Sequence, residues 1–141
     1  MPENLGPGEW LTIQLRKNED ILERSDLQGD LLQNSQHLRL QQKHSSDEIA
    51  QLHDHYHTEQ TMIRNAMHDG DRLSSEYQEL MLELQESQDE EDRKIAMLES
   101  EAKDYESRIE TENSTLQNTI TALDEEIKGL EEVQENNIKG Q

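Results

Sequence analysis

Apolar residues recur at seven-residue steps along the chain from residue 49 onward. Two lines of positions, three residues apart, carry most of them: Ile49, Tyr56, Ile63, Gly70, Tyr77 and Leu84 on one, and Leu52, Glu59, Ala66, Leu73, Leu80 and Ser87 on the other. A narrow apolar stripe with polar residues between its members is typical of an α-helix in a coiled coil. The pattern therefore predicts an all-α protein.

The repeat changes register after Leu84. The ten residues 85–94 contain no apolar side chain, and a new line of sevens follows them: Ile95, Ala102, Ile109, Leu116, Leu123 and Leu130. The earlier line would have continued at Glu91, so the register slips by four residues. A slip of this size is a stutter, which locally unwinds a left-handed supercoil.

Two topologies satisfy this pattern. A continuous helix tolerates a stutter, and residues 71–128 contain neither glycine nor proline, so a long coiled-coil helix over about 47–136 is the first interpretation. The alternative is an antiparallel helical hairpin that turns near 85–94. A second weak point lies at residues 68–71, where Gly70 either ends a helix or destabilises one.

One or two short amphipathic helices are predicted upstream, over residues 9–43. Two sets of leucines share spacings of four and seven: Leu11, Leu15 and Leu22, then Leu27, Leu31 and Leu38. A joint is expected near 18–25 or 41–46. Ser45 followed by Glu48 matches a capping box, which predicts that the long helix starts there.

These patterns divide the chain into four parts. They are an extended lead-in over 1–8, which holds both prolines, the short helices over 9–43, a coiled-coil rod over 46–137 with its register slip near 85–94, and a tail over 138–141.

Composition agrees with a thin helical structure. Hydrophobic residues make up 30% of the 141 residues, and four of them are aromatic. That is too little apolar material for a thick core, whereas a coiled coil needs about two apolar positions in seven. Net charge is −20, made of −6 over residues 1–72 and −14 over residues 73–141. Such a chain repels nucleic acid, and a basic protein face is its electrostatic complement.

The apolar stripe predicts contact with other helices, because a single helix cannot cover its own stripe unless the chain folds back. The residues expected at this partner-helix interface are Ile49, Leu52, Tyr56, Ile63, Leu73, Tyr77, Leu80, Leu84, Ile95, Leu98, Ile109, Leu116, Leu123 and Leu130. Glutamates flank the stripe in the C-terminal half. A parallel homodimer would place like charges together, so a helical partner with a basic face is favoured over self-association. Antiparallel packing of the acidic half against the less acidic N-terminal half is the other arrangement that avoids this repulsion.

The chemistry-bearing residues do not form a recognisable catalytic set. The chain has no cysteine, no glycine-rich phosphate loop and no Ser–His–Asp cluster, so neither enzyme activity nor a cofactor is expected. All six histidines lie between residues 37 and 68. His53 and His57 are one helical turn apart and are weak candidates for a Zn or Ni site, but solvated surface histidines are the preferred interpretation.

Targeting features are equally sparse. No apolar run approaches the roughly 20 residues that span a bilayer, and the first residues have no basic start followed by an apolar stretch. A soluble protein is expected, with the cytoplasm favoured and export without a signal peptide left open.

The stretch 111–124, TENSTLQNTITALD, resembles the terminal helices of type III secretion filament and needle-tip proteins. That resemblance implies an exported filament component, although the apolar N-terminal helix of those families is absent here. The preferred function is a structural coiled-coil subunit that assembles with itself or other helical proteins into an elongated complex or filament. A second hypothesis is an acidic chaperone or adaptor that binds a basic or amphipathic helix.

Overall fold

A computed structural model describes the backbone of residues 6–139 and the side chains of residues 6–137. Helix α1 spans Pro7–His68 and helix α2 spans Ser75–Lys139, with a turn over 69–74 between them. Within these residues there is no strand, and the all-α prediction is confirmed.

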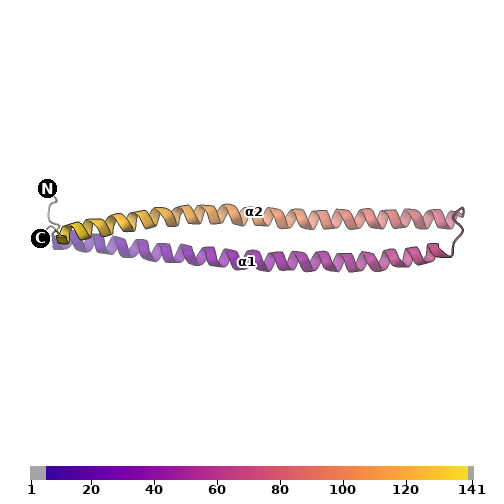
Figure 1. Ribbon diagram of the computed structural model, residues 1–141, viewed down its shortest axis with the longest axis horizontal. Helices are drawn as coiled ribbons and strands as arrows, with labels where there is room; N and C mark the ends of the chain where they lie inside the picture. The colour runs from indigo at the N-terminus through magenta and orange to yellow at the C-terminus, as the bar shows by residue number, and fades with distance from the viewer. Residues whose placement is uncertain (1–5, 140–141) are drawn as a thin grey trace. The chain divides into compact units, whose positions relative to one another are not determined.

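The chain divides into two units. Unit 1 combines Met1–His37 with Arg108–Gln141, and unit 2 comprises Leu38–Ser107. In each unit a segment of α1 lies beside a segment of α2 (Figure 1). Hydrogen bonds in unit 1 join Arg16 to Glu126 and Asn34 to Asn113, so residue numbers fall along α2 as they rise along α1. The two segments are therefore antiparallel, as in a hairpin.

The antiparallel helical hairpin, the alternative topology, is confirmed, but its turn is not at 85–94, which is helical. The first interpretation, a single helix over 47–136, is wrong because α1 ends at His68. The observed turn, residues 69–74, starts within the weak point at residues 68–71.

Local chemistry explains both outcomes. In 85–94, side chains one turn apart stabilise the helix: Gln85 Nε2 donates to Asp89 Oδ1 at 3.1 Å, and Lys94 lies 3.0 Å from Glu90. In the turn, Asp71 Oδ1 accepts from the Leu73 amide, which holds a non-helical backbone.

The start of α2 is capped by Ser74. Its Oγ accepts a hydrogen bond from the Tyr77 amide at 3.1 Å and donates to the Asp71 carbonyl at 2.7 Å. An N-cap serine satisfies one of the amide groups that a helix start leaves without a partner. The cap therefore fixes the start of α2 ten residues before the predicted turn at 85–94.

Helix α1 has no joint. The predicted breaks near 18–25 and 41–46, and the predicted helix start at Ser45, lie inside one continuous helix. Neither stretch contains glycine or proline, so backbone hydrogen bonds continue through both. Glu48 pairs with the His44 ring at 2.6 Å, so its carboxylate faces the preceding turn of a helix that has already begun.

The ends of the chain also differ from the predicted extended lead-in and tail. Residues 1–5 and 140–141 lie outside the described residues. The Trp10 amide donates to the Gly6 carbonyl at 3.0 Å, and α1 begins at Pro7. Proline suits this position because it has no amide hydrogen to leave unpaired and its φ is already helical. At the other end, α2 continues to Lys139.

The two units have different buried residues. Unit 1 buries Ile109, Ile120, Leu123 and Ile127, whereas the only buried hydrophobic residue described in unit 2 is Tyr56, which is 2% exposed. Two packed helices cover only one stripe on each other, so most other residues of the stripe are half-buried. Both units also bury polar side chains in this stripe, among them Gln134 in unit 1 and Gln60 in unit 2.

Candidate interaction surfaces

The residues predicted to contact a partner helix lie on the shielded stripe, with one exception. Tyr56, Ile109 and Leu123 are buried. The half-buried members are Ile49, Leu52, Ile63, Tyr77, Leu80, Leu84, Ile95, Leu98, Leu116 and Leu130. Leu73 lies in the turn and is 91% exposed. Since α1 and α2 shield each other, contact of these residues with a second protein stays a prediction.

A polar layer crosses the stripe in unit 1. Lys17 Nζ donates to Gln134 Oε1 at 3.2 Å, and Gln134 Nε2 donates to Gln14 Oε1 at 2.9 Å. Further along, Asn34 Nδ2 donates to Asn113 Oδ1 at 3.0 Å. Buried polar pairs of this kind are satisfied in only one alignment of two helices, so they favour the observed register over slipped ones.

Two arginines of α1 pair with carboxylates of α2 in unit 1. Arg16 lies 2.6 Å from Glu126, and Arg24 lies 2.7 Å from Asp124. The Glu126 contact raises the pKa of Arg16, mainly through the hydrogen bond. These pairs are solvent-exposed in part, so each adds little to stability but consumes a cation of α1.

Asp20 is a buried carboxyl beside the Arg16–Glu126 pair. It is 8% exposed, and its Oδ2 atom has no hydrogen-bond partner among the described residues. Burial raises the pKa of Asp20, the negative charge of Glu126 raises it further, and Arg16 opposes both. The folded chain therefore favours the carboxylate form of Asp20 less than the unfolded chain does.

Unit 2 has its own polar layer, built on Gln60. Its Nε2 atom donates to Glu91 Oε2 at 3.0 Å and to Ser87 Oγ at 3.4 Å. The His53 ring meets the other oxygen of Glu91 at 3.2 Å. Shielded positions on α2 here run Ser87, Glu91 and Ile95, which are two successive four-residue steps. The stripe thus passes through a hydrogen-bonded polar layer where apolar residues are missing.

Next to this layer, Lys94 lies over Tyr56. The Lys94 ammonium is 5.5 Å from the centre of the tyrosine ring and 3.0 Å from Glu90. Contacts with Tyr56 and Glu90 raise the pKa of Lys94, and the hydrogen bond from Lys94 lowers the pKa of Glu90. The arrangement is a cation–π contact with a counter-ion.

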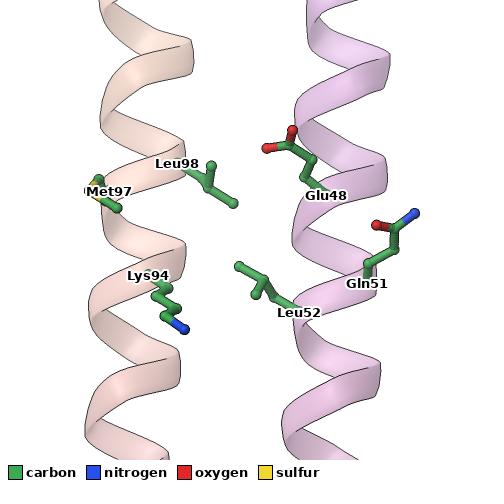
Figure 2. A pocket seen from close by; sticks show the side chains of 6 residues that line it. All are labelled: Glu48, Gln51, Leu52, Lys94, Met97 and Leu98. Carbon is green, nitrogen blue, oxygen red and sulfur yellow. The ribbon is translucent and has the colours of Figure 1, made fainter.

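An apolar groove of about 380 Å³ opens beside Lys94 in unit 2. Figure 2 shows Leu52 and Leu98 pointing toward each other between α1 and α2, with Met97 on the outer side of α2. Met97 is 57% exposed. Two helices therefore leave part of the predicted interface open at this level.

A second apolar feature, on α1 in unit 1, was not among the predicted interface residues. Leu11, Leu15 and Leu22 are 53%, 55% and 67% exposed, and we call them the outer stripe. The sequence carries the signal: the second leucine set, beginning at Leu27, is displaced by 16 residues, or about 160° around a continuous helix. The outward position of these leucines was not predicted, because two separate helices joined by a break could each turn their leucines inward.

Carboxylates flank the outer stripe. Glu19 and Asp26 are exposed and lie four residues after Leu15 and Leu22, on the same side of the helix. The cations of this segment, Arg16, Lys17 and Arg24, contact Glu126, Gln134 and Asp124 of α2 instead. The outer stripe is thus an apolar line with acidic neighbours.

The two histidines considered as metal ligands are both exposed. The His53 ring contacts Glu91 of α2. Among the described residues, no group of three or more His, Cys, Asp or Glu side chains is placed to hold a metal ion.

Neither helix has, in its described residues, a stretch long and apolar enough to cross a membrane. Comparisons with family models, with curated proteins and with solved structures found no match to this chain.

Proposed function

We propose that this protein is a non-enzymatic structural subunit that binds an amphipathic helix of another protein along the outer stripe of α1. The partner helix has an apolar face with lysine or arginine beside it. The observation that carries the proposal is the exposure of Leu11, Leu15 and Leu22 in one line on a helix whose opposite side already packs against α2. Leucines exposed in one line at helical spacing support the proposal, because an amphipathic helix can cover them with its own apolar face.

Charge favours a different protein over a second copy. Two outer stripes packed together would bring Glu19 and Asp26 of one chain near those of the other. The arginines that could offset them are paired with α2. A helix with basic residues beside its apolar face turns the same carboxylates into attractive contacts.

The hairpin favours a stable subunit over an adaptor that folds only on its partner. Each helix shields much of the apolar stripe of the other, and the polar layers around Gln134 and Gln60 favour the observed alignment. We therefore expect a full helical circular dichroism signal from the pure protein, whereas an adaptor of that second kind would gain its helix signal only on binding.

The test uses the full chain and two synthetic helical peptides that share one leucine face. One peptide carries lysines and the other glutamates beside the leucines. We expect the lysine peptide alone to bind, and L11S/L15S/L22S to weaken its binding by about tenfold or more, since each leucine contributes buried apolar area. L40S/L82S changes exposed leucines of unit 2 and should bind like the wild type.

Equal binding by L11S/L15S/L22S and the wild type would overturn the outer stripe as the contact surface. Sedimentation of the pure chain tests the choice of partner. A dimer that L11S/L15S/L22S converts to a monomer would show that a second copy occupies the stripe and would overturn the heteromeric assignment.

A further inference from the structure

A small, open cavity lies at the turn between α1 and α2, and half of the residues that line it are basic. Arg64, His68 and Arg72 line it together with Met67, Gly70 and Tyr77, and its volume is about 260 Å³. None of these six residues is acidic. In a chain of net charge −20, this concentration of basic side chains around one cavity stands apart from its surroundings.

The two arginines of this cavity lack carboxylate partners. Arg16, Arg24 and Lys94 each lie within 3.0 Å of an acidic side chain. Arg64 and Arg72 form no ion pair with any residue that the structure describes. Carboxylates are not scarce, because the chain has 33 acidic and 13 basic side chains. Arg64 at the end of α1 and Arg72 in the turn are thus two guanidinium groups without an ion-pair partner among the described residues.

Hydrogen bonds hold the walls of the cavity in place. The Arg72 carbonyl accepts from Gln78 Nε2 at 2.9 Å, and the Gly70 amide donates to the Met67 carbonyl at 3.0 Å. A Cβ atom on Gly70 would lie 3.5 Å from the Tyr77 ring, so the glycine backbone packs directly on that ring. The nearby Asp71 carboxylate is held by the Leu73 amide, which donates to its Oδ1 atom.

Arg64 and His68 are four residues apart at the end of α1 and share one face of it, while Arg72 comes from the turn. The basic groups thus approach the cavity from two segments. A guanidinium presents paired N–H donors that match the two oxygens of a carboxylate, and two such groups can hold one or two carboxylates.

We infer that this cavity is an anion site that takes the carboxylates of an acidic protein segment. Asp69 and Asp71 neighbour the site in sequence, and they disfavour a phosphate dianion more than a carboxylate monoanion. The site lies in unit 2 and does not rest on the outer stripe, which lies in unit 1.

The probe is a synthetic peptide with the sequence of residues 86–92, ESQDEED, titrated into the ¹⁵N-labelled full chain. We expect shifts of the arginine Nε–Hε signals and of the Gly70 and Leu73 amides. R64Q/R72Q should weaken binding by about tenfold or more, because charged hydrogen bonds are lost. R39Q/K43Q removes the same charge from exposed positions on α1 and should bind like the wild type.

Equal losses in R64Q/R72Q and R39Q/K43Q would show that net charge alone drives binding and would overturn the site. Binding of inorganic phosphate without binding of the peptide would overturn the ligand class. If R64Q/R72Q loses helix signal, R64K/R72K takes its place; it keeps the charge but lacks the forked donors, so its affinity should still fall.

Sedimentation of the full chain separates two sources of such a segment. Self-association that R64Q/R72Q removes identifies a second copy of this chain as the source. Binding of the peptide by a chain that stays monomeric assigns the site to a different acidic protein.

Discussion

At the scale of single residues, Asp20 couples stability to pH. Burial and the charge of Glu126 raise its pKa, so the folded chain holds this proton more tightly than the unfolded chain does. The folded state then binds more protons in the window between the unfolded and the raised pKa. By linkage, the contribution of Asp20 is most favourable at low pH and is lost as the pH rises through the raised pKa.

Asp20→Asn should therefore stabilise the protein at neutral pH. The substitution removes a buried carboxylate whose Oδ2 has no described partner, and Asn does not titrate. We expect the Tm at pH 7 to rise by about 2–4 °C, which corresponds to roughly 1 kcal/mol at this chain length. Thermal melts followed by circular dichroism between pH 4 and pH 7 measure the effect, and the gain should shrink toward pH 4.

Asp26→Asn is the matched control, because Asp26 is an exposed carboxylate on the same helix. It makes the same change in charge without a change in burial. A lower Tm for Asp20→Asn than for Asp26→Asn at pH 7 would mean that the attraction between Asp20 and Arg16 outweighs burial.

At the scale of elements, the cap at Ser74 should set the stability of the start of α2. Ser74→Ala removes the acceptor of the Tyr77 amide and the donor to the Asp71 carbonyl. We expect a loss of about 1 kcal/mol, within the usual range for a helix N-cap. Urea unfolding followed by circular dichroism measures it. The neighbouring Ser75→Ala should change the midpoint little, and equal losses in the two variants would contradict the role of the cap.

The position of the turn, next to this cap, is the part of the fold that the seven-residue spacing did not predict. Seven-residue spacing was enough to predict two regions of helix, because the apolar stripe has to face something along its length. It could not choose between a turn at 69–74 and one at 85–94. The second stretch is the more polar, but polarity opposes burial and not helix formation, and Gln85 and Glu90 both have partners one turn away.

The sequence predicted the inward residues, but not the outer stripe or the cavity at the turn. The inward residues, such as Leu116 and Leu123, followed from the repeat alone, yet the repeat does not say whether they meet the same chain or another. The outer stripe depended on α1 being continuous, since Leu11 and Leu27 take opposite sides only on one unbroken helix. The cavity near Arg64 and Arg72 had no signal in the repeat, because it depends on how the turn folds.

At the scale of the whole molecule, the net charge and the ion pairs act on folding stability in opposite directions. A net charge of −20 on 141 residues, with few cations placed between the carboxylates, creates repulsion that any compact state increases. The described ion pairs are solvent-exposed in part and offset only a little of it. Dissolved salt weakens both effects, so the sign of the salt dependence reports which one is larger.

We expect the repulsion to win, so that the Tm rises with salt. Between about 0.01 M and 0.15 M ionic strength the screening length falls from about 30 Å to about 8 Å, which removes repulsion between distant carboxylates but weakens close pairs less. Thermal melts of the wild type across this range give the slope of Tm against salt.

A second chain, with glutamine at positions 99, 101, 106, 110, 125 and 131, carries a net charge of −14, because six of the 33 acidic groups are gone. Its Tm at low salt should exceed that of the wild type and should depend less on salt. A Tm that falls with added salt would mean that contacts such as Arg16–Glu126 outweigh the repulsion. The charged side chains would then stabilise the folded chain through their ion pairs.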